Sequence, residues 1–173
     1  LSMMPQRIWN GVYSELMIAM PLFMLAGELM NTGGITKRII NFCMELLRPI
    51  RGGLGEVNIV ASMIFGGISG SSVADTSALG SILIPAMEQE GYPPDASAGI
   101  TVASSTMGMI IPPSTPMVVY AMISGASIGA LFMAGAVPGI LIGLTQLVLV
   151  YVISHRKGWH PKKTAFNAKR FWK

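Results

Sequence analysis

The amino-acid sequence predicts an all-α integral membrane protein. The 173-residue chain is 51% hydrophobic and only 12% charged, whereas a soluble domain carries about 25% charged residues. Its mean hydropathy is +0.58. Residues 96–155 contain no Asp, Glu, Lys or Arg, and that run is far longer than the ~20 residues that one membrane-spanning helix needs.

A break within the uncharged run points to a function. The run is interrupted by Ile111-Pro112-Pro113-Ser114, and a double proline cannot continue a helix because proline lacks the N–H and clashes with the preceding turn. Broken backbone at membrane depth is tolerated only where protein or a water-filled cavity satisfies the freed carbonyls. This pattern is typical of transporters.

The first two predicted helices differ in character. Leu16–Met30 is apolar apart from Glu28, and with its flanks (13–32) it is long enough to span a membrane. Residues 36–50 instead repeat apolar side chains at three- and four-residue steps opposite a basic polar face. That pattern favours an amphipathic helix lying along the membrane surface, and the alternative is an ordinary helix packed against a soluble partner.

Two short apolar pieces follow, 57–68 and 78–87, joined by the Gly/Ser-rich stretch 69–77. Each is too short to span comfortably, which suggests a re-entrant helical hairpin. Basic residues cluster at 37–51 and 156–173. If residues 57–87 dip in and return, both clusters lie on the same side of the membrane, as the positive-inside tendency requires. A straight span would place them on opposite sides.

The remaining chain predicts a half-helix over 96–109, the break, a short helix over 116–123 and a long span over 130–154. The tail is basic, and we expect it to be a cytoplasmic linker. The predicted segments are a first transmembrane helix with flanks (1–35), an interfacial helix (36–51), a re-entrant hairpin (52–92), a Pro-broken transmembrane helix (93–124), a long transmembrane helix (125–155) and a basic tail (156–173).

The hairpin tip and the break are the candidate functional regions. Both place backbone carbonyls and small hydroxyls inside an apolar region, and sodium takes such oxygen ligands. Helices that begin after each break present N–H groups that favour anions. A carboxylate substrate beside a sodium ion is therefore the natural pairing. We predict cation binding by Ser69, Gly70, Ser71, Ser72, Asp75, Pro112 and Ser114, and substrate binding by Ser72, Thr76, Thr106, Pro113, Ser114 and Thr115.

Three of the polar positions have two interpretations. Asp75 is the only charged residue between Glu56 and Glu88; an intramembrane carboxylate indicates function, but the position also suits an N-cap of the second hairpin helix. Glu28 is open to the same functional interpretation, but because it lies near a span end we expect it to pair with a basic residue at the cytoplasmic surface. The hydroxyls of residues 101–106 either line a polar path or allow close helix packing.

The residues resemble a known family. Ala26–Asn31, Gly66–Asp75, Ile84–Met87, Gly91-Tyr92, Ile111–Ser114, Leu131–Gly135 and Val137–Gly139 occur in this order. Together they resemble the large membrane subunit of TRAP transporters, the tripartite ATP-independent periplasmic transporters. The resemblance covers almost the whole chain, from about Pro5 to Gly158.

The resemblance implies a permease of the bacterial inner membrane that takes up carboxylates, such as C4-dicarboxylates, sialic acid or other sugar acids, with sodium as coupling ion and no other cofactor. It implies two partners, a periplasmic substrate-binding protein and a small four-helix membrane subunit, separate or fused. It also implies an inverted repeat with an elevator-type moving domain. By position, residues 69–75 match the first hairpin tip and residues 111–114 match the broken helix facing it. We expect the second, inverted half and a helix before Tyr13 to be missing from this chain.

Other function classes fit the residues less well. An aspartyl intramembrane protease needs two Asp residues in spans, and only Asp75 qualifies; a serine enzyme needs a base, and no His or Lys lies in the predicted bilayer region. We therefore expect no enzyme. Its single cysteine, Cys43, excludes an intrachain disulfide. The alternative is an ion channel, or a structural membrane subunit without coupled transport.

Overall fold

A computed structural model of the chain describes residues 3–12, 15–47 and 53–159. In these ranges the chain forms helices and no strands, as predicted. The basic tail beyond residue 159 lies outside them. The helices are α1 (Met3–Val12), α2 (Glu15–Thr32), α3 (Ile35–Leu47), α4 (Gly53–Ser69), α5 (Ser72–Gln89), α6 (Pro94–Ser105), the 3₁₀ helix η1 (Thr106–Met109), α7 (Thr115–Ser124) and α8 (Ile128–Lys157).

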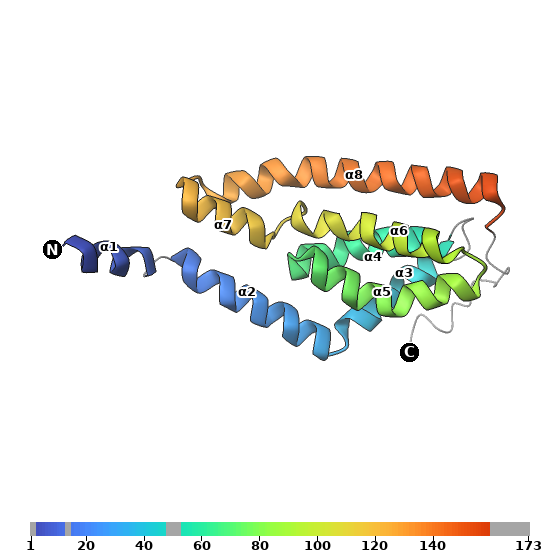
Figure 1. Cartoon of the computed structure of the whole chain (residues 1–173), viewed down its shortest axis with the longest axis horizontal. Coiled ribbons are helices and arrows are strands. Elements are labelled where there is room, and N and C mark those ends of the chain that lie inside the picture. Colours follow the sequence, from blue (N-terminus) through green and yellow to red (C-terminus); the bar gives the residue numbers. More distant parts are fainter. Residues whose placement is uncertain (1–2, 13–14, 48–52, 160–173) are drawn as a thin grey trace.

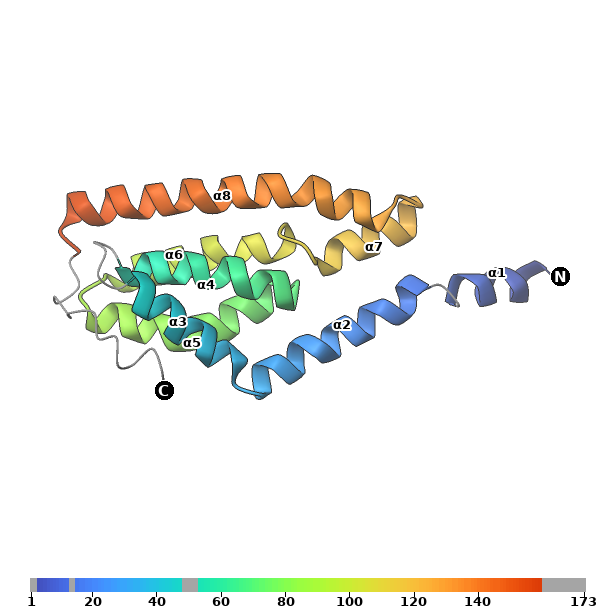
Figure 2. The ribbon, with the colours of Figure 1, turned by 180° about the vertical axis from the view of Figure 1, so that it is seen from behind.

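The long helix α8 runs along one side of the molecule (Figure 1). Helices α6 and α7 follow it in two pieces, and α4 and α5 fold back on each other as a helical hairpin whose tip lies beside the break between α6 and α7. Seen from behind, α3 covers the hairpin while α2 and α1 extend away from it (Figure 2). The expectation of no helix before Tyr13 was wrong, because Met3–Val12 is helical.

The hydrophobic core joins the predicted interfacial helix to the hairpin. Buried side chains of α3, α4 and α5 form one cluster: Ile40, Cys43, Val57, Ala61, Phe65, Leu79 and Leu83. The opposite face of α3 is exposed, with Lys37 and Arg38 on it. The apolar face of this amphipathic helix is therefore the face that packs against the hairpin.

Helix α8 is the element of the described chain that is long and apolar enough to cross a membrane by length and composition, with a mean hydropathy of 2.2 over its best window. It begins at an N-cap, Ser127, and ends at Gly158, whose φ of 71° is left-handed. Gly135, Gly139 and Gly143 lie on one face of α8, where the break and α4 pack closely against it. Helix α8 thereby holds the break in place beside the hairpin.

Candidate functional site

The hairpin tip is fastened directly to the start of α7. Gly70 has a φ of +61°, a backbone conformation that favours glycine. Its N–H donates to the carbonyl of Gly66 (2.9 Å), and its own carbonyl accepts from the N–H of Thr115 (3.4 Å). A Cβ on Gly70 would lie 2.9 Å from the Thr115 nitrogen and 3.1 Å from the Pro113 carbonyl oxygen. No side chain fits there without moving the break.

Asp75 lies behind the tip in a space made by two glycines. It is fully buried. The Ser69 hydroxyl donates a hydrogen bond to its Oδ1, whereas Oδ2 is buried and makes no hydrogen bond. A Cβ on Gly66 would lie 2.6 Å from the Gly108 Cα, and a Cβ on Gly108 would collide with the Asp75 carboxylate. The two glycines therefore make room for the carboxylate between the helices.

The N-cap interpretation of Asp75 was wrong. The N-cap of α5 is Ser71, whose hydroxyl oxygen accepts from the N–H of Ala74 (3.4 Å). Asp75 lies one turn further, in the helix itself, and its N–H donates to the Ser71 carbonyl (3.0 Å). Because the cap position is filled by a serine, the carboxylate is left free to point at the space between the helices.

The break between α6 and α7 is held by side-chain and backbone contacts. The Ser114 hydroxyl donates to the Met109 carbonyl (2.6 Å) and is buried. The peptide bond between Pro112 and Pro113 is cis. A Cβ on Gly67 would lie 3.3 Å from the Pro112 carbonyl oxygen, so both proline carbonyls lie against the end of α4 and the tip. The break therefore faces the hairpin tip, as the sequence predicted.

A cavity of about 390 Å³ opens in front of the tip. The first residues of α5 and α7 line it together, so two helix N-termini meet at one space. Glu28 of α2 also lines it, although from the sequence we expected this residue to pair with a basic residue at the cytoplasmic surface. The lining residues are Gly27, Glu28, Phe65, Ser69, Gly70, Ser71, Ser72, Val73, Ala74, Met109, Thr115 and Pro116.

The cavity gathers only part of the predicted set. Ser69 through Ser72 and Thr115 line it, Asp75 lies directly behind Ser69, and Pro112, Pro113 and Ser114 lie behind the tip. Of the predicted substrate residues, Thr76, Thr106, Pro113 and Ser114 do not line it. Thr76 donates to the Ser72 carbonyl (2.8 Å) and Thr106 to the Ala103 carbonyl (2.7 Å), each to the backbone one turn earlier.

The hydroxyls of α6 form a buried polar seam with α4 and not a path. The Asn58 amide donates to the Thr101 hydroxyl (2.7 Å), and the Ser62 hydroxyl donates to the Ser104 hydroxyl (3.0 Å). Ser104 in turn donates to the Thr101 carbonyl (3.0 Å). All four side chains are fully buried. For Thr101 and Ser104 the packing interpretation is therefore the correct one.

Sequence reasoning missed the roles of Gly66 and Gly108. Their close approach depends on two helices that are distant in sequence, so a local pattern does not reveal it. The signal available was the density of small residues on both helices, which permits close packing. Glu28 was noticed, but its place at the tip follows from the direction in which α2 leaves α3.

A hairpin tip fastened to a broken helix, beside two converging helix N-termini, is typical of membrane solute transporters built on discontinuous helices. Comparison with known proteins narrows this class. A family model for the tripartite ATP-independent periplasmic transporter, DctM component, matches residues 1–173, and the chain belongs to this family.

Curated relatives bear the same family names. The chain is 42% identical over 166 residues to the sialic acid TRAP transporter large permease protein of Vibrio cholerae, covering 96% of this chain and 39% of the relative. It is 47% identical over 150 residues to the sialic acid TRAP transporter permease protein of Haemophilus influenzae (86% and 24%). It is 45% identical over 141 residues to the C4-dicarboxylate TRAP transporter large permease protein of Pseudomonas aeruginosa (82% and 33%). The chain spans about a quarter to two fifths of these relatives.

Proposed function

We propose that this chain is part of the large permease of a sodium-coupled, binding-protein-dependent uptake system for carboxylates in a bacterial inner membrane. Its α4–α5 hairpin enters the membrane and returns, and both basic clusters lie on the cytoplasmic side. A second, inverted half completes an elevator-type transporter, and a small four-helix subunit and a periplasmic binding protein are its partners. The names of the relatives, for sialic acid and C4-dicarboxylates, support the substrate class.

The observation that supports this most is the unpaired oxygen of Asp75. A buried carboxylate oxygen without a hydrogen-bond donor is costly unless a cation or proton joins it. The Ser69 hydroxyl bonds to the same carboxylate, and the carbonyl oxygens of Pro112 and Pro113 lie close to Gly67 and Gly70 at the tip. Oxygen ligands of this kind suit sodium, and the fit is chemical: one anionic ligand with several neutral ones.

The charges around the cavity offer a reason for coupling. Asp75 and Glu28 place two carboxylates at or behind the cavity, and these disfavour a second anion. A sodium ion beside Asp75 would offset the repulsion between these two carboxylates and an anionic substrate. The N-termini of α5 and α7 would then favour the substrate carboxylate. Sodium and substrate should therefore bind cooperatively.

The test is uptake of radiolabelled sialic acid or succinate into proteoliposomes that hold the full-length permease with its small subunit and binding protein. We expect uptake to require both the binding protein and an inward sodium gradient. Uptake indifferent to sodium would rule out the cation site. A conductance that does not saturate with substrate would favour the channel alternative.

Asp75→Asn sharpens the test. It removes the anionic ligand with little change of shape, and we expect the sodium concentration for half-maximal uptake to rise at least about ten-fold, the equivalent of ~1.4 kcal/mol. Ser72→Ala should raise it less. The matched control is Asp95→Asn, an exposed Asp in the first turn of α6, which should leave the sodium dependence unchanged. An unchanged value in both Asp75→Asn and Ser72→Ala would remove the tip from the site.

A further inference from the structure

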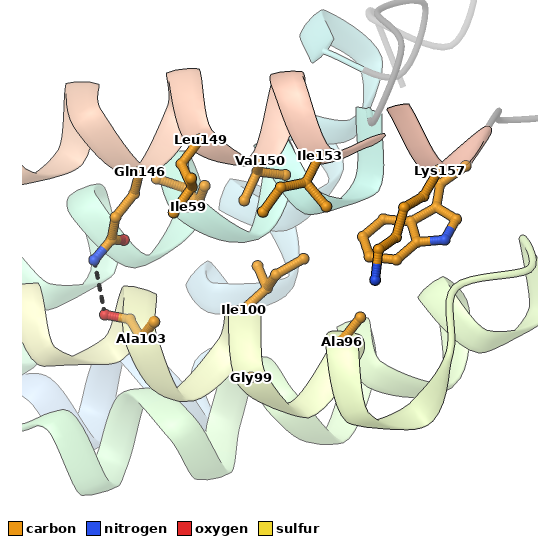
Figure 3. Close-up of a pocket in the computed structure, with 11 residues that line it drawn as sticks. Ile59, Ala96, Gly99, Ile100, Ala103, Gln146, Leu149, Val150, Ile153 and Lys157 are labelled. Atoms are coloured by element: carbon orange, nitrogen blue, oxygen red, sulfur yellow. Dashed lines mark hydrogen bonds between the residues drawn. The ribbon is translucent and has the colours of Figure 1, made fainter. Parts of the chain in front are cut away.

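A second cavity lies between α6 and α8 (Figure 3), and it shares no lining residue with the cavity at the hairpin tip. It has a volume of about 310 Å³. Its lining is apolar along most of its length and polar at the two ends. The lining residues are Ile59, Ala96, Gly99, Ile100, Ala103, Gln146, Leu149, Val150, Ile153, Lys157 and Trp159. We call it the α6–α8 groove.

The spacing of these residues shows that the groove runs along the helices. Those of α6 repeat at three- and four-residue steps, as do those of α8, so each helix contributes one face. Helix α6 presents small side chains, Ala96, Gly99 and Ala103. A Cβ on Gly99 would meet nothing within 4 Å. Small residues often let two helices pack in direct contact. Here they instead leave an open space between α6 and α8.

The two ends of the groove differ in chemistry. At one end the Gln146 Nε2 donates to the Ala103 carbonyl (3.0 Å), a bond that crosses from α8 to α6 (Figure 3). At the other end Lys157 closes the last turn of α8, which also contains His155 and Arg156. The Lys157 Nζ lies 5.6 Å from the ring centroid of Trp159. A cation beside a tryptophan is typical of the headgroup level of a membrane.

The length of the groove matches one leaflet. Gln146 and Lys157 are separated by about 16 Å along α8 at 1.5 Å per residue. Half of a hydrocarbon core of about 30 Å is about 15 Å. Because α8 is suited by length and composition to cross a membrane, we expect its basic end at the interface and Gln146 near the midplane.

The volume selects the occupant. A helix about 10 Å across would displace roughly 1,300 Å³ over a length of about 16 Å, more than the groove offers. An extended hydrocarbon chain is thin enough to enter. Its apolar surface suits the apolar walls, and a basic pocket at the membrane surface suits an anionic headgroup.

We propose that the α6–α8 groove binds an anionic phospholipid, with one acyl chain between the helices and the phosphate at Lys157. The bound chain fills the space left by Ala96 and Gly99 and supports α6, which leads directly into the break beside the hairpin tip. The site depends on the membrane position of α8 and not on sodium coupling, so it stands or fails separately from the proposed transport.

The test is native mass spectrometry of the full-length permease, delipidated in detergent and titrated with phosphatidylglycerol or phosphatidylethanolamine of the same acyl chains. We expect a one-to-one complex that prefers phosphatidylglycerol. Lys157→Gln should weaken phosphatidylglycerol binding about five-fold, the factor that one Lys contributes near an anionic surface. It should leave phosphatidylethanolamine binding unchanged.

Two control pairs keep the test specific. Lys37→Gln removes the same charge from an exposed position of α3 and should not change the complex. Gly99→Leu fills the groove without striking a neighbour at its Cβ and should abolish binding of both lipids, whereas Gly129→Leu, at the far end of α8, should not. Equal losses in Lys37→Gln and Lys157→Gln would overturn the proposal, as would full binding by Gly99→Leu.

A photo-crosslinking residue identifies the occupant directly. p-Azidophenylalanine at Ile153, which lines the groove, should crosslink to lipid when full-length permease is irradiated in phosphatidylglycerol-containing vesicles. A crosslinked peptide, whether from the rest of the permease, a second copy or the small subunit, would show that protein covers the groove and would overturn the lipid site.

Discussion

Two buried polar regions of this molecule are built on opposite principles. In the seam between α4 and α6, the side chains of Asn58, Ser62, Thr101 and Ser104 all make hydrogen bonds to one another or to backbone. At the hairpin tip, Asp75 satisfies one oxygen through Ser69 and leaves the other without a donor. The regions are consecutive along α4, so the same helix takes part in both.

The difference shows how function can be separated from packing without a ligand in view. A buried polar group that is fully hydrogen-bonded fixes the orientation of its helices and has no capacity to bind anything else. A buried carboxylate with one unpaired oxygen lowers stability until a partner arrives. Disrupting the seam should therefore change stability, and disrupting the tip should change ligand dependence.

The largest effect should come from the glycines around Asp75. In Gly66→Ala the new Cβ would lie 2.6 Å from the Cα of Gly108, so backbone must move, and we expect a loss of about 1–3 kcal/mol or more. Gly108→Ala strikes the Asp75 side chain instead. Thermal unfolding of the full-length permease in detergent measures both losses.

The two glycine variants should respond differently to a second change. Asp75→Ala removes the atoms that Gly108→Ala strikes, so the double variant should recover unfolding temperature but not sodium dependence. Gly66→Ala should not be rescued, because its main collision is with backbone. Gly99→Ala is the control, since its Cβ meets nothing within 4 Å, and helix propensity should make it neutral or stabilising by up to ~1 kcal/mol. Equal rescue of both variants would contradict this geometry.

The next effect should come from Asn58→Ala. The amide hydrogen-bonds the Thr101 hydroxyl and also accepts from Ser104, and removing it leaves buried groups without partners at a cost of about 1–3 kcal/mol. We expect a lower unfolding temperature with an unchanged half-saturating sodium concentration. Asp75→Asn should give the reverse result, because it removes a buried charge. If Asn58→Ala shifts the sodium dependence as Asp75→Asn does, the seam and the tip are one functional unit.

A smaller effect is expected from removing a single hydrogen bond of the seam between α4 and α6. Ser62 and Ser104 meet hydroxyl to hydroxyl at 3.0 Å. A double-mutant cycle with Ser62→Ala and Ser104→Ala should give a coupling energy of about 0.5–1.5 kcal/mol, the net value of a typical hydrogen bond. Ser62→Ala paired with Ser81→Ala, an exposed serine of α5 bonded within its own helix, should give none. Additive losses for Ser62 and Ser104 would mean that the seam is not a network.

Much of this arrangement could be predicted from sequence. The Gly/Ser-rich stretch 69–77 and the prolines at 112–113 predicted the hairpin and the break, because glycine and proline act on local backbone. The amphipathic period of α3 predicted its buried face. These features depend on residues that are close together in the chain.

The parts that could not be predicted depend on residues that are far apart. Whether Thr101 faces a path or a partner depended on where α4 would place Asn58, and the period of α6 does not contain that information. The cap of α5 was assigned to Asp75 as one of two interpretations, although Ser71 satisfies the same rule four residues earlier. The position of Glu28 depended on the direction of α2.

The measurement that perturbs the protein least is thiol labelling, which compares the core beneath α3 with the hairpin tip. Cys43 is fully buried, and burial raises the pKa of its thiol to about 11. Because the thiolate is the reactive form, and the usual pKa is near 8.5, its thiolate fraction at pH 7.5 is lower by more than about 100-fold. We expect N-ethylmaleimide to spare Cys43 until the protein is unfolded, and labelling to accelerate as pH rises toward 11.

A cysteine placed by Ser72→Cys, on the cavity wall, should label quickly at pH 7.5 and be protected by sodium with substrate. Peptide mapping by mass spectrometry reads both sites in one sample; rapid labelling of Cys43 in the folded protein would mean that α3 separates from the hairpin and that the core described above opens.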